Sequence, residues 1–218
     1  MVYDFHTHTC LSDGELTCIE LIRRAVVHGY RTIAVTDHVG VGSLERIITE
    51  LNRDCALAQE HWKINAIPGV ELTHVPPAAI DKMAARAREL GAKLVVVHGE
   101  TIAEPVEKGT NLAAVRSRFV DILAHPGFLT AEERDIAVEN GIFIEITARK
   151  GHSLTNGHVA LMTQTCRANV LVNSDTHISE DLLTAAFAAA VACGSGIRQD
   201  ELVQILEKNP QTLLRRLS

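Results

Sequence analysis

Short, almost continuously apolar segments alternate with longer amphipathic segments along the whole of this 218-residue chain. The apolar segments are too short for helices and rich in β-branched residues, which is typical of strands buried on both faces. We expect strands at 2–5, 32–38, 64–72, 93–100, 120–127, 142–147 and 169–177. Strands of this kind that alternate with helices form parallel sheets, so the pattern predicts an α/β protein.

A segment with helical periodicity follows each expected strand. We expect helices at 15–29, 43–61, 77–90, 111–117, 131–140, 157–167 and 181–193, and a last helix at 200–214. Gly29 and Gly91 stand where glycine commonly ends a helix. Seven strand–helix units favour a barrel, slightly smaller or more distorted than the eight-stranded kind, over an open doubly wound sheet. The periodicity by itself is compatible with both architectures.

Composition narrows the class of protein. With 46% hydrophobic residues, the chain is long enough for one sizeable core, and we expect a single domain over residues 1–218. The formal charge of −6 gives no general attraction to nucleic acid or to an anionic membrane. No apolar stretch approaches the roughly 20 residues of a membrane span, and no secretory leader is evident. The five cysteines lack metal or disulfide spacing, so we expect reduced thiols and a cytoplasmic location.

The expected strands end in residues that can bind metal ions. These residues are His6 and His8, Asp37 and His38, Glu71, His98, His125, and Asp175 with His177. In a barrel, the carboxyl ends of the strands meet at one face. A single histidine at this level is more often structural, but six of the eleven histidines lie there. The set as a whole therefore predicts a metal site.

The residue types indicate which metals and which chemistry. Imidazoles and carboxylates without thiolates suit Zn²⁺, Mn²⁺ or Fe²⁺. One ion takes about four to six ligands, so eight or nine candidates predict two or three ions. Clustered divalent ions stabilise the attacking and leaving oxygens of a displacement at phosphorus and lower the pKa of a bridging water towards ~7. Hydrolysis of a phosphate ester is the leading interpretation.

Six motifs in register with the strands resemble those of a known family. The segments DFHTHTCLSDG, TDH, PGVEL, VVHGE, LAHPG and NSDTH, in this order, are similar to the motifs of the PHP family, named for polymerase and histidinol phosphatase domains. The resemblance runs from Tyr3 to His177 and loosely to the last helix. It implies a distorted (βα)7 TIM-like barrel with a trinuclear metal site at the C-terminal ends of the strands.

The resemblance also implies how the ligands are shared among ions. Carried over by position, the family pattern assigns His6, His8, Glu71 and Asp175 to a first ion, Glu71 again with His98 and His125 to a second, and Asp13, His38 and His177 to a third. Some family members have a histidine where Asp13 stands, and a carboxylate can ligate there as well. We expect a hydroxide that bridges the first two ions to attack phosphorus, with Glu71, Asp175 and His177 as the central catalytic residues.

Residues beside the ligands have less specific roles. Arg149 and Lys150, after the sixth strand, could clamp a substrate phosphate because guanidinium and ammonium groups bind phosphate oxygens. A solvated basic loop is the alternative; it stays open for Arg149 and is preferred for Lys150. In the same segment, we interpret His152 as a cap of the following helix rather than a substrate contact. Asp37 is a candidate to orient the rings of His6 and His8.

The substrate has three candidate classes. Family analogy favours a small phosphate monoester, such as histidinol phosphate or a nucleotide. A phosphodiesterase or 3′–5′ exonuclease is the alternative, against which the acidic charge and the 4% of aromatic residues count. A non-catalytic barrel subunit of an RNA–protein assembly is disfavoured because the ligand set is complete. We expect a small phosphorylated partner, no membrane partner and no favoured nucleic-acid partner; the oligomeric state is left open.

Overall fold

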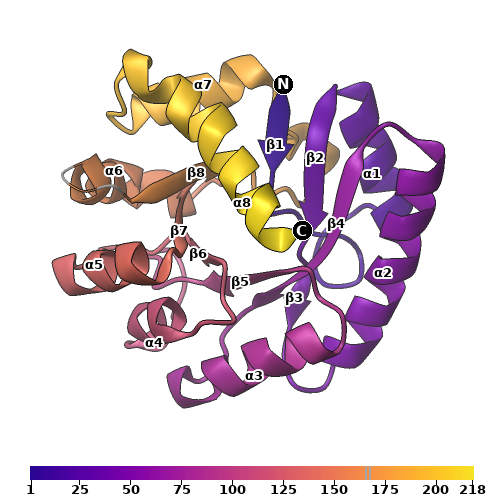
Figure 1. The fold of residues 1–218 in the computed structure, drawn as a ribbon, viewed down its shortest axis with the longest axis horizontal. Coiled ribbons are helices and arrows are strands. Elements are labelled where there is room, and N and C mark those ends of the chain that lie inside the picture. Colours follow the sequence, from indigo (N-terminus) through magenta and orange to yellow (C-terminus); the bar gives the residue numbers. More distant parts are fainter. Residues whose placement is uncertain (165, 167) are drawn as a thin grey trace.

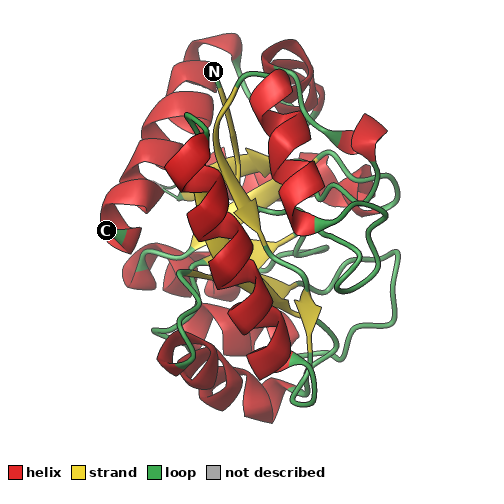
Figure 2. Ribbon diagram, turned by 90° about the vertical axis from the view of Figure 1, so that its right-hand side faces the viewer, coloured by secondary structure: helices red, strands yellow, loops and turns green. Residues whose placement is uncertain are grey.

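The computed structural model describes the whole chain except residues 165 and 167. Within the described residues, eight parallel strands form one sheet that curves into a barrel with helices around it (Figures 1 and 2). The strands are β1 (Val2–Asp4), β2 (Tyr30–Val35), β3 (His38–Val39), β4 (Asn65–Leu72), β5 (Leu94–His98), β6 (Ile122–Ala124), β7 (Phe143–Thr147) and β8 (Asn169–Asn173). Their order is β1-β2-β4-β5-β6-β7-β8, and β3 pairs with β4.

The predicted distorted (βα)7 barrel is confirmed. β2 and β3 correspond to one expected strand that is interrupted at Thr36 and Asp37, so seven strand–helix units make the barrel. The ring closes just beyond β1 and β8, where Thr7 and Thr176 form a parallel bridge. There the amide of His8 donates to the carbonyl of Thr176 over 2.8 Å, and the amide of Asp175 donates to the carbonyl of His6 over 2.9 Å. Closure therefore fixes the chain at the predicted ligands.

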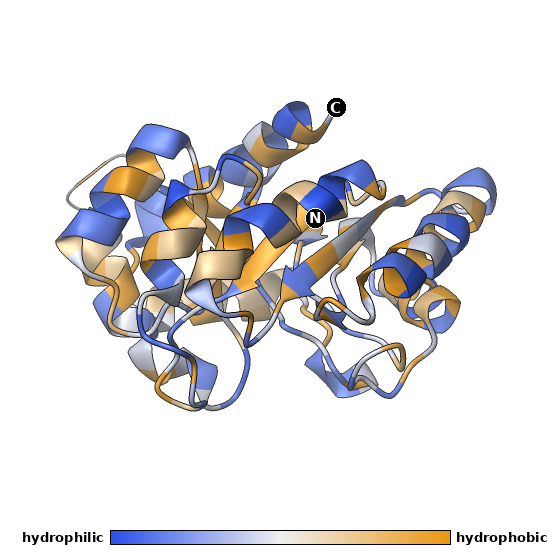
Figure 3. Ribbon diagram, turned by 90° about the horizontal axis from the view of Figure 1, so that it is seen from below, coloured by the Kyte–Doolittle hydropathy of each residue, from blue (hydrophilic) through white to orange (hydrophobic). Residues whose placement is uncertain are grey.

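The helices cover the outside of the barrel (Figure 2). They are α1 (Cys18–Val27), α2 (Leu44–His61), α3 (Pro77–Glu89), α4 (Thr110–Arg116), α5 (Ala131–Asn140), α6 (Asn156–Gln164), α7 (Ala185–Gly194) and α8 (Asn209–Leu217). Many helices carry alternating hydrophilic and hydrophobic bands (Figure 3), as expected for helices with one buried face. None of the helices in the described part of the chain is both long and apolar enough to cross a membrane.

The apolar side chains form two layers, one inside the barrel and one between the strands and the helices. On β5, Leu94 and Val96 belong to an inner cluster, and Val95 and Val97 belong to the outer layer beneath the helices. This alternation follows from the two-residue period of a strand. Leu213 of α8 joins the inner cluster, because α8 lies across one end of the barrel (Figure 1). The polar site is built at the other end.

The C-terminal helices differ from the expectation. The helix predicted at 181–193 begins only at Ala185, where the side chain of Thr184 accepts a hydrogen bond from the amide of Phe187. The helix predicted at 200–214 is instead a 3₁₀ turn, a π turn at Gln204–Lys208, and then α8. Pro210 has no amide to continue an α-helical ladder, and a π turn accommodates this interruption. The predicted end of another helix at Arg167 lies outside the described residues.

Candidate metal centre

All nine predicted ligands lie at the open end of the barrel, in four overlapping groups. The groups are His6, His8 and Asp175; His6, Glu71 and His125; His98, His125 and His152; and His8, Asp13, His38 and His177. Within each group, one ligand atom per residue lies within 4.8 Å of the others. Because the groups share residues, ions bound to them would be close neighbours. That these nine residues bind metal stays a prediction.

The two innermost groups contain buried polar atoms that face one another. Nε2 of His6 lies 3.2 Å from Oε1 of Glu71, and Nε2 of His8 lies 3.1 Å from Oδ1 of Asp175. All four atoms are buried, and none has a hydrogen bond to any described residue. Unpaired buried polar atoms are costly, and a common cation between these facing atoms would satisfy them. The donor set, imidazole nitrogen and carboxylate oxygen, fits Zn²⁺, Mn²⁺ or Fe²⁺.

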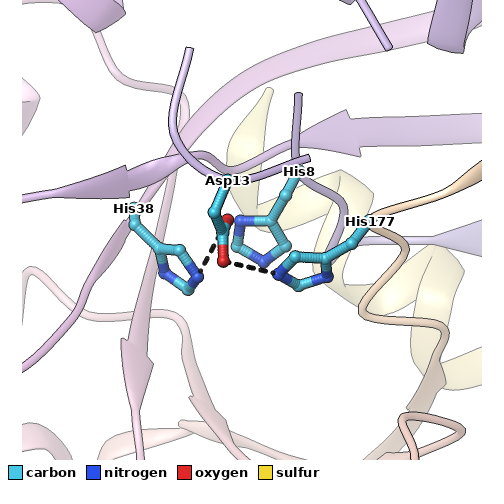
Figure 4. A group of neighbouring side chains, drawn as sticks. All are labelled: His8, Asp13, His38 and His177. Atoms are coloured by element: carbon cyan, nitrogen blue, oxygen red, sulfur yellow. Dashed lines mark ion pairs between the residues drawn. The ribbon is translucent and has the colours of Figure 1, made fainter. Parts of the chain in front are cut away.

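Figure 4 shows the group at the mouth of the barrel, in which the side chains of Asp13 and His38 are 55% and 24% exposed. Asp13 reaches over the rings, with Oδ1 3.3 Å from Nε2 of His38 and Oδ2 3.2 Å from Nε2 of His177. His8 lies beneath, its ring centroid 4.2 Å from that of His38. Burial acts to raise the pKa of Asp13, but the two imidazoles outweigh it and hold this pKa well below its usual range. The carboxylate is therefore ionised and available to a cation.

Protein groups orient the imidazole rings. Nδ1 of His6 donates to Oε2 of Glu145 over 2.8 Å, Nδ1 of His98 donates to the carbonyl of Gly99 over 3.1 Å, and Nδ1 of His177 donates to the carbonyl of Asp175 over 2.9 Å. Each of these bonds leaves the Nε2 lone pair for a metal. Strand β7, which carries none of the predicted ligands, thus contributes Glu145.

The expected role of Asp37 is wrong. Its carboxylate accepts hydrogen bonds from the amide and hydroxyl of Thr9 and from the hydroxyl of Ser12, over 2.7 to 3.0 Å. Asp37 therefore folds the loop that carries Asp13 instead of orienting His6 or His8. The sequence places Asp37 at the correct level of the barrel but does not show which way its side chain turns.

The backbone is unusual at two ligands. His125 has a φ of 26° and Asp175 a φ of 55°, values that L-residues adopt at a cost. Close contacts between turns support this conformation: a Cβ on Gly127 would lie 1.9 Å from the carbonyl oxygen of Glu100, and one on Gly99 would lie 2.3 Å from that of Ala124. The glycines of the VHGE and AHPG segments are thus needed where two loops meet beside the centre.

Inside the site, the pKa values of His6 and His8 are shifted in opposite directions. Burial acts to lower the pKa of His6, but the carboxylates of Glu145, Glu71 and Asp175 outweigh it and raise this pKa well above its ordinary value. For His8, burial dominates and lowers the pKa to about 4. The direction of the shift favours the protonated form of His6 in the metal-free protein. A cation would displace this proton, because a metal ligand must be deprotonated.

Two residues that the sequence interpretation did not assign to the metal site border it. His152 lies in the group with His98 and His125, where we expected a helix cap. Glu104, in the loop after β5, lies 3.3 Å from Nε2 of His98. His152 follows the end of β7 by five residues, and Glu104 follows the end of β5 by six. Neither stands at a strand end, which is the signal that marked most of the predicted ligands.

The proposed phosphate clamp has the following geometry. Nη1 of Arg149 lies 3.3 Å from Oδ2 of Asp181, and this oxygen also accepts the amide of His177 over 3.1 Å. Arg149 is therefore held beside the loop that carries a predicted ligand. The side chain of Lys150 is exposed. Phosphate binding by either residue stays a prediction.

Residues 4–213 match the model of the PHP domain family. This chain is a PHP protein. An uncharacterized protein of Methanocaldococcus jannaschii is 48% identical over 218 residues, which cover all of both chains. A probable phosphatase of Thermoanaerobacter pseudethanolicus is 26% identical over 92% of this chain and 89% of that protein. The 5′–3′ exoribonuclease Rnm of Escherichia coli is 27% identical over 76% of this PHP chain, which spans about half of that enzyme (49%).

Solved structures show the same fold. A structure from the metal-dependent tyrosine phosphatases of Bacillus subtilis and Streptococcus pneumoniae has a TM-score of 0.64 at 19% identity, covering 99% of this PHP chain and 95% of that chain. The histidinol phosphate phosphatase of Lactococcus lactis, solved with zinc, L-histidinol and phosphate, has a TM-score of 0.58 at 13% identity, covering 90% and 94%. At these identities, the likeness concerns the barrel.

Proposed function

We propose that this PHP protein is a metal-dependent phosphoesterase that hydrolyses a small phosphate monoester with two or three divalent ions. The observation that carries the proposal is the set of overlapping ligand groups: His6, His8 and His125 each belong to two groups. Side chains shared in this way hold cations close together, as required for a displacement at phosphorus. The probable phosphatase of Thermoanaerobacter and the histidinol phosphate phosphatase of Lactococcus lactis support this class of reaction.

The residues of the chain divide the work. His6, His8, Glu71 and Asp175 would hold the innermost cation, and Asp13, His38 and His177 would hold the one at the mouth. Bound divalent ions supply charge neutralisation for phosphate oxygens and a lowered pKa for water. Because Asp13 is 55% exposed and Glu71 is fully buried, a substrate reaches the mouth group first. Asp181 occupies part of the Arg149 guanidinium, whose other N–H groups are suited to a phosphate oxygen.

A nuclease is the second candidate, because the Escherichia coli relative is a 5′–3′ exoribonuclease. It shares the same chemistry at phosphorus but needs a surface that binds a polynucleotide. The net charge of −6 does not favour one. We therefore place the monoester first.

A substrate screen with metal analysis tests the proposal. Metal-free protein is loaded with Zn²⁺ or Mn²⁺, its ions per chain are counted, and phosphate release is followed from histidinol phosphate, nucleoside monophosphates and 5′-phosphorylated oligoribonucleotides. Turnover of a monoester supports the proposal, and degradation of the oligonucleotides alone favours the nuclease. Full ion content without hydrolysis of any substrate would refute both.

Glu71→Gln tests the centre of the site. Glu71 belongs to the group with His6, whose Nε2 lies 3.2 Å away, and it also lies 2.6 Å from Nδ1 of His38 in the mouth group, so its charge acts on residues of two groups. We expect the variant to lose at least one ion, and to lose more activity than the roughly 10- to 100-fold that changes outside the ligands cause. The matched control is Glu107→Gln, an exposed carboxylate. Normal activity with full metal content in Glu71→Gln would contradict the shared role.

A further inference from the structure

A histidine and a glutamate from two neighbouring loops extend the metal centre on the side of His98 and His125. His152 opens the 3₁₀ turn η1 (His152–Thr155) after β7, and Glu104 lies in the loop after β5. Nε2 of His152 is 3.4 Å from Oε1 of Glu104, and Nε2 of His98 is 3.3 Å from Oε2 of the same carboxylate. Each of His98, His125 and His152 also offers a nitrogen within 4.8 Å of the other two.

The ring of His152 is buried and held in one orientation. It is 7% exposed and stacks on the ring of His125, with centroids 4.3 Å apart and planes 16° apart. Oγ1 of Thr101 lies 2.8 Å from its Nδ1. A Cβ on Gly151 would lie 3.5 Å from Cβ of Ala103, so the two loops are packed together here. With Nδ1 bound to Thr101, Nε2 is the atom directed towards Glu104.

The spacing of these atoms matches a set of ligands. Bonds of about 2.0–2.2 Å from a divalent ion to nitrogen and oxygen place neighbouring ligand atoms roughly 3–3.5 Å apart. The contacts of Glu104 with His98 and His152 fall in this range. A helix cap does not need a buried imidazole whose Nε2 faces a carboxylate and two predicted ligands.

We propose that His152 and Glu104 are further ligands of the ion that Glu71, His98 and His125 are predicted to hold. This position is then built from five side chains and leaves at most one place open on a six-coordinate ion. The ion is therefore the most completely protein-held of the cluster. The inference rests on the metal centre of the proposed function but not on its reaction.

The test measures metal binding directly. Metal-free His152→Asn and Glu104→Gln proteins are titrated with Zn²⁺ by calorimetry, and bound ions are counted by elemental analysis. Asparagine retains a polar atom near Nδ1 for Thr101 but has none at Nε2. We expect one ion of the cluster to bind roughly 10- to 100-fold more weakly in each variant while the others keep their affinity.

Controls separate ligation from general disturbance. His158→Asn removes an imidazole six positions along the chain whose Nε2 donates to the carbonyl of Leu129, and Glu107→Gln removes a nearby exposed carboxylate. Both should bind metal as the unchanged protein does. If His152→Asn does not fold, as judged by circular dichroism, Thr101→Val supplies the test. This change frees the ring of His152 and should weaken the binding of the same ion.

The outcomes are decisive for each residue. Unchanged stoichiometry and affinity in His152→Asn or in Glu104→Gln would overturn the assignment of that residue, and an equal loss in the control variants would overturn the inference as a whole. A protein that binds its ions as expected but hydrolyses no phosphate ester would refute the proposed function alone.

Discussion

The buried carboxylate of Glu145 should tune the affinity of the innermost metal position. Oε2 of Glu145 accepts hydrogen bonds from Nδ1 of His6 and from Nδ2 of Asn173, both over 2.8 Å. The change Glu145→Gln retains an amide oxygen that can accept both bonds and removes only the negative charge. It therefore isolates what the charge contributes to His6 as a ligand.

The magnitude follows from the hydrogen bond between Glu145 and His6. A hydrogen bond to a charged group contributes about 1.5–3 kcal/mol, against about 1 kcal/mol for a neutral one. The change therefore weakens the support of His6 by about 0.5–2 kcal/mol, which is roughly 2- to 30-fold in metal affinity. This range overlaps the roughly 10- to 100-fold effects of groups that orient metal ligands.

The change also alters how strongly protons compete with metal for His6, so its effect on metal affinity should depend on pH. Glu145 is one cause of the raised pKa of His6, so its neutralisation lowers that pKa and weakens the competition of protons with metal. The affinity deficit of the variant should therefore be largest at alkaline pH, where protons do not compete, and smaller at neutral pH.

Calorimetric titration of the metal-free proteins with Zn²⁺ at several pH values measures both effects. Glu133→Gln, a change to the capping carboxylate of α5, serves as the control and should bind metal normally. An affinity in Glu145→Gln equal to that of the unchanged protein at every pH, or a deficit that grows as the pH falls, would refute the reasoning.

Two further predictions concern the backbone and the proton balance. Gly127→Ala should reduce the number of bound ions, because its Cβ would lie 1.9 Å from the carbonyl oxygen of Glu100, close to His125. Gly40→Ala is the control and should bind metal normally, because no atom lies within 4 Å of the added Cβ. Elemental analysis measures the metal content of both variants, and full metal content in Gly127→Ala would contradict the role of the turn. Metal affinity should rise with pH, because His6, with its raised pKa, must release a proton to bind metal, whereas His8, whose pKa is about 4, is already neutral near pH 7. Calorimetry in buffers of different ionisation enthalpy counts the released protons, and zero release at neutral pH would exclude a protonated His6.

The architecture was largely predictable because it depends on local pattern. Near-continuous apolar segments followed by helical periodicity determine parallel strands and covering helices, and the order of these segments along the chain is the order of strands around the barrel. The prediction was less accurate at the C-terminal helix, where Pro210 lacks the amide that would continue the α-helix and a π turn precedes it. Whether the sheet is open or closed depends on contacts between residues far apart in the chain, such as Thr7 and Thr176.

The sequence by itself determined which residues gather at the mouth, because the end of a strand is a position that the apolar pattern marks. The strand ends marked eight of the nine predicted ligands, and the resemblance to the PHP family added Asp13. Only the tertiary structure decided which side chains face one another: Glu145 supports His6, Asp37 turns to Thr9, and Glu104 meets His152 from another loop. The physical reason is that a strand's two-residue period specifies direction, whereas the contacts of loop residues depend on which loops the closed barrel brings together.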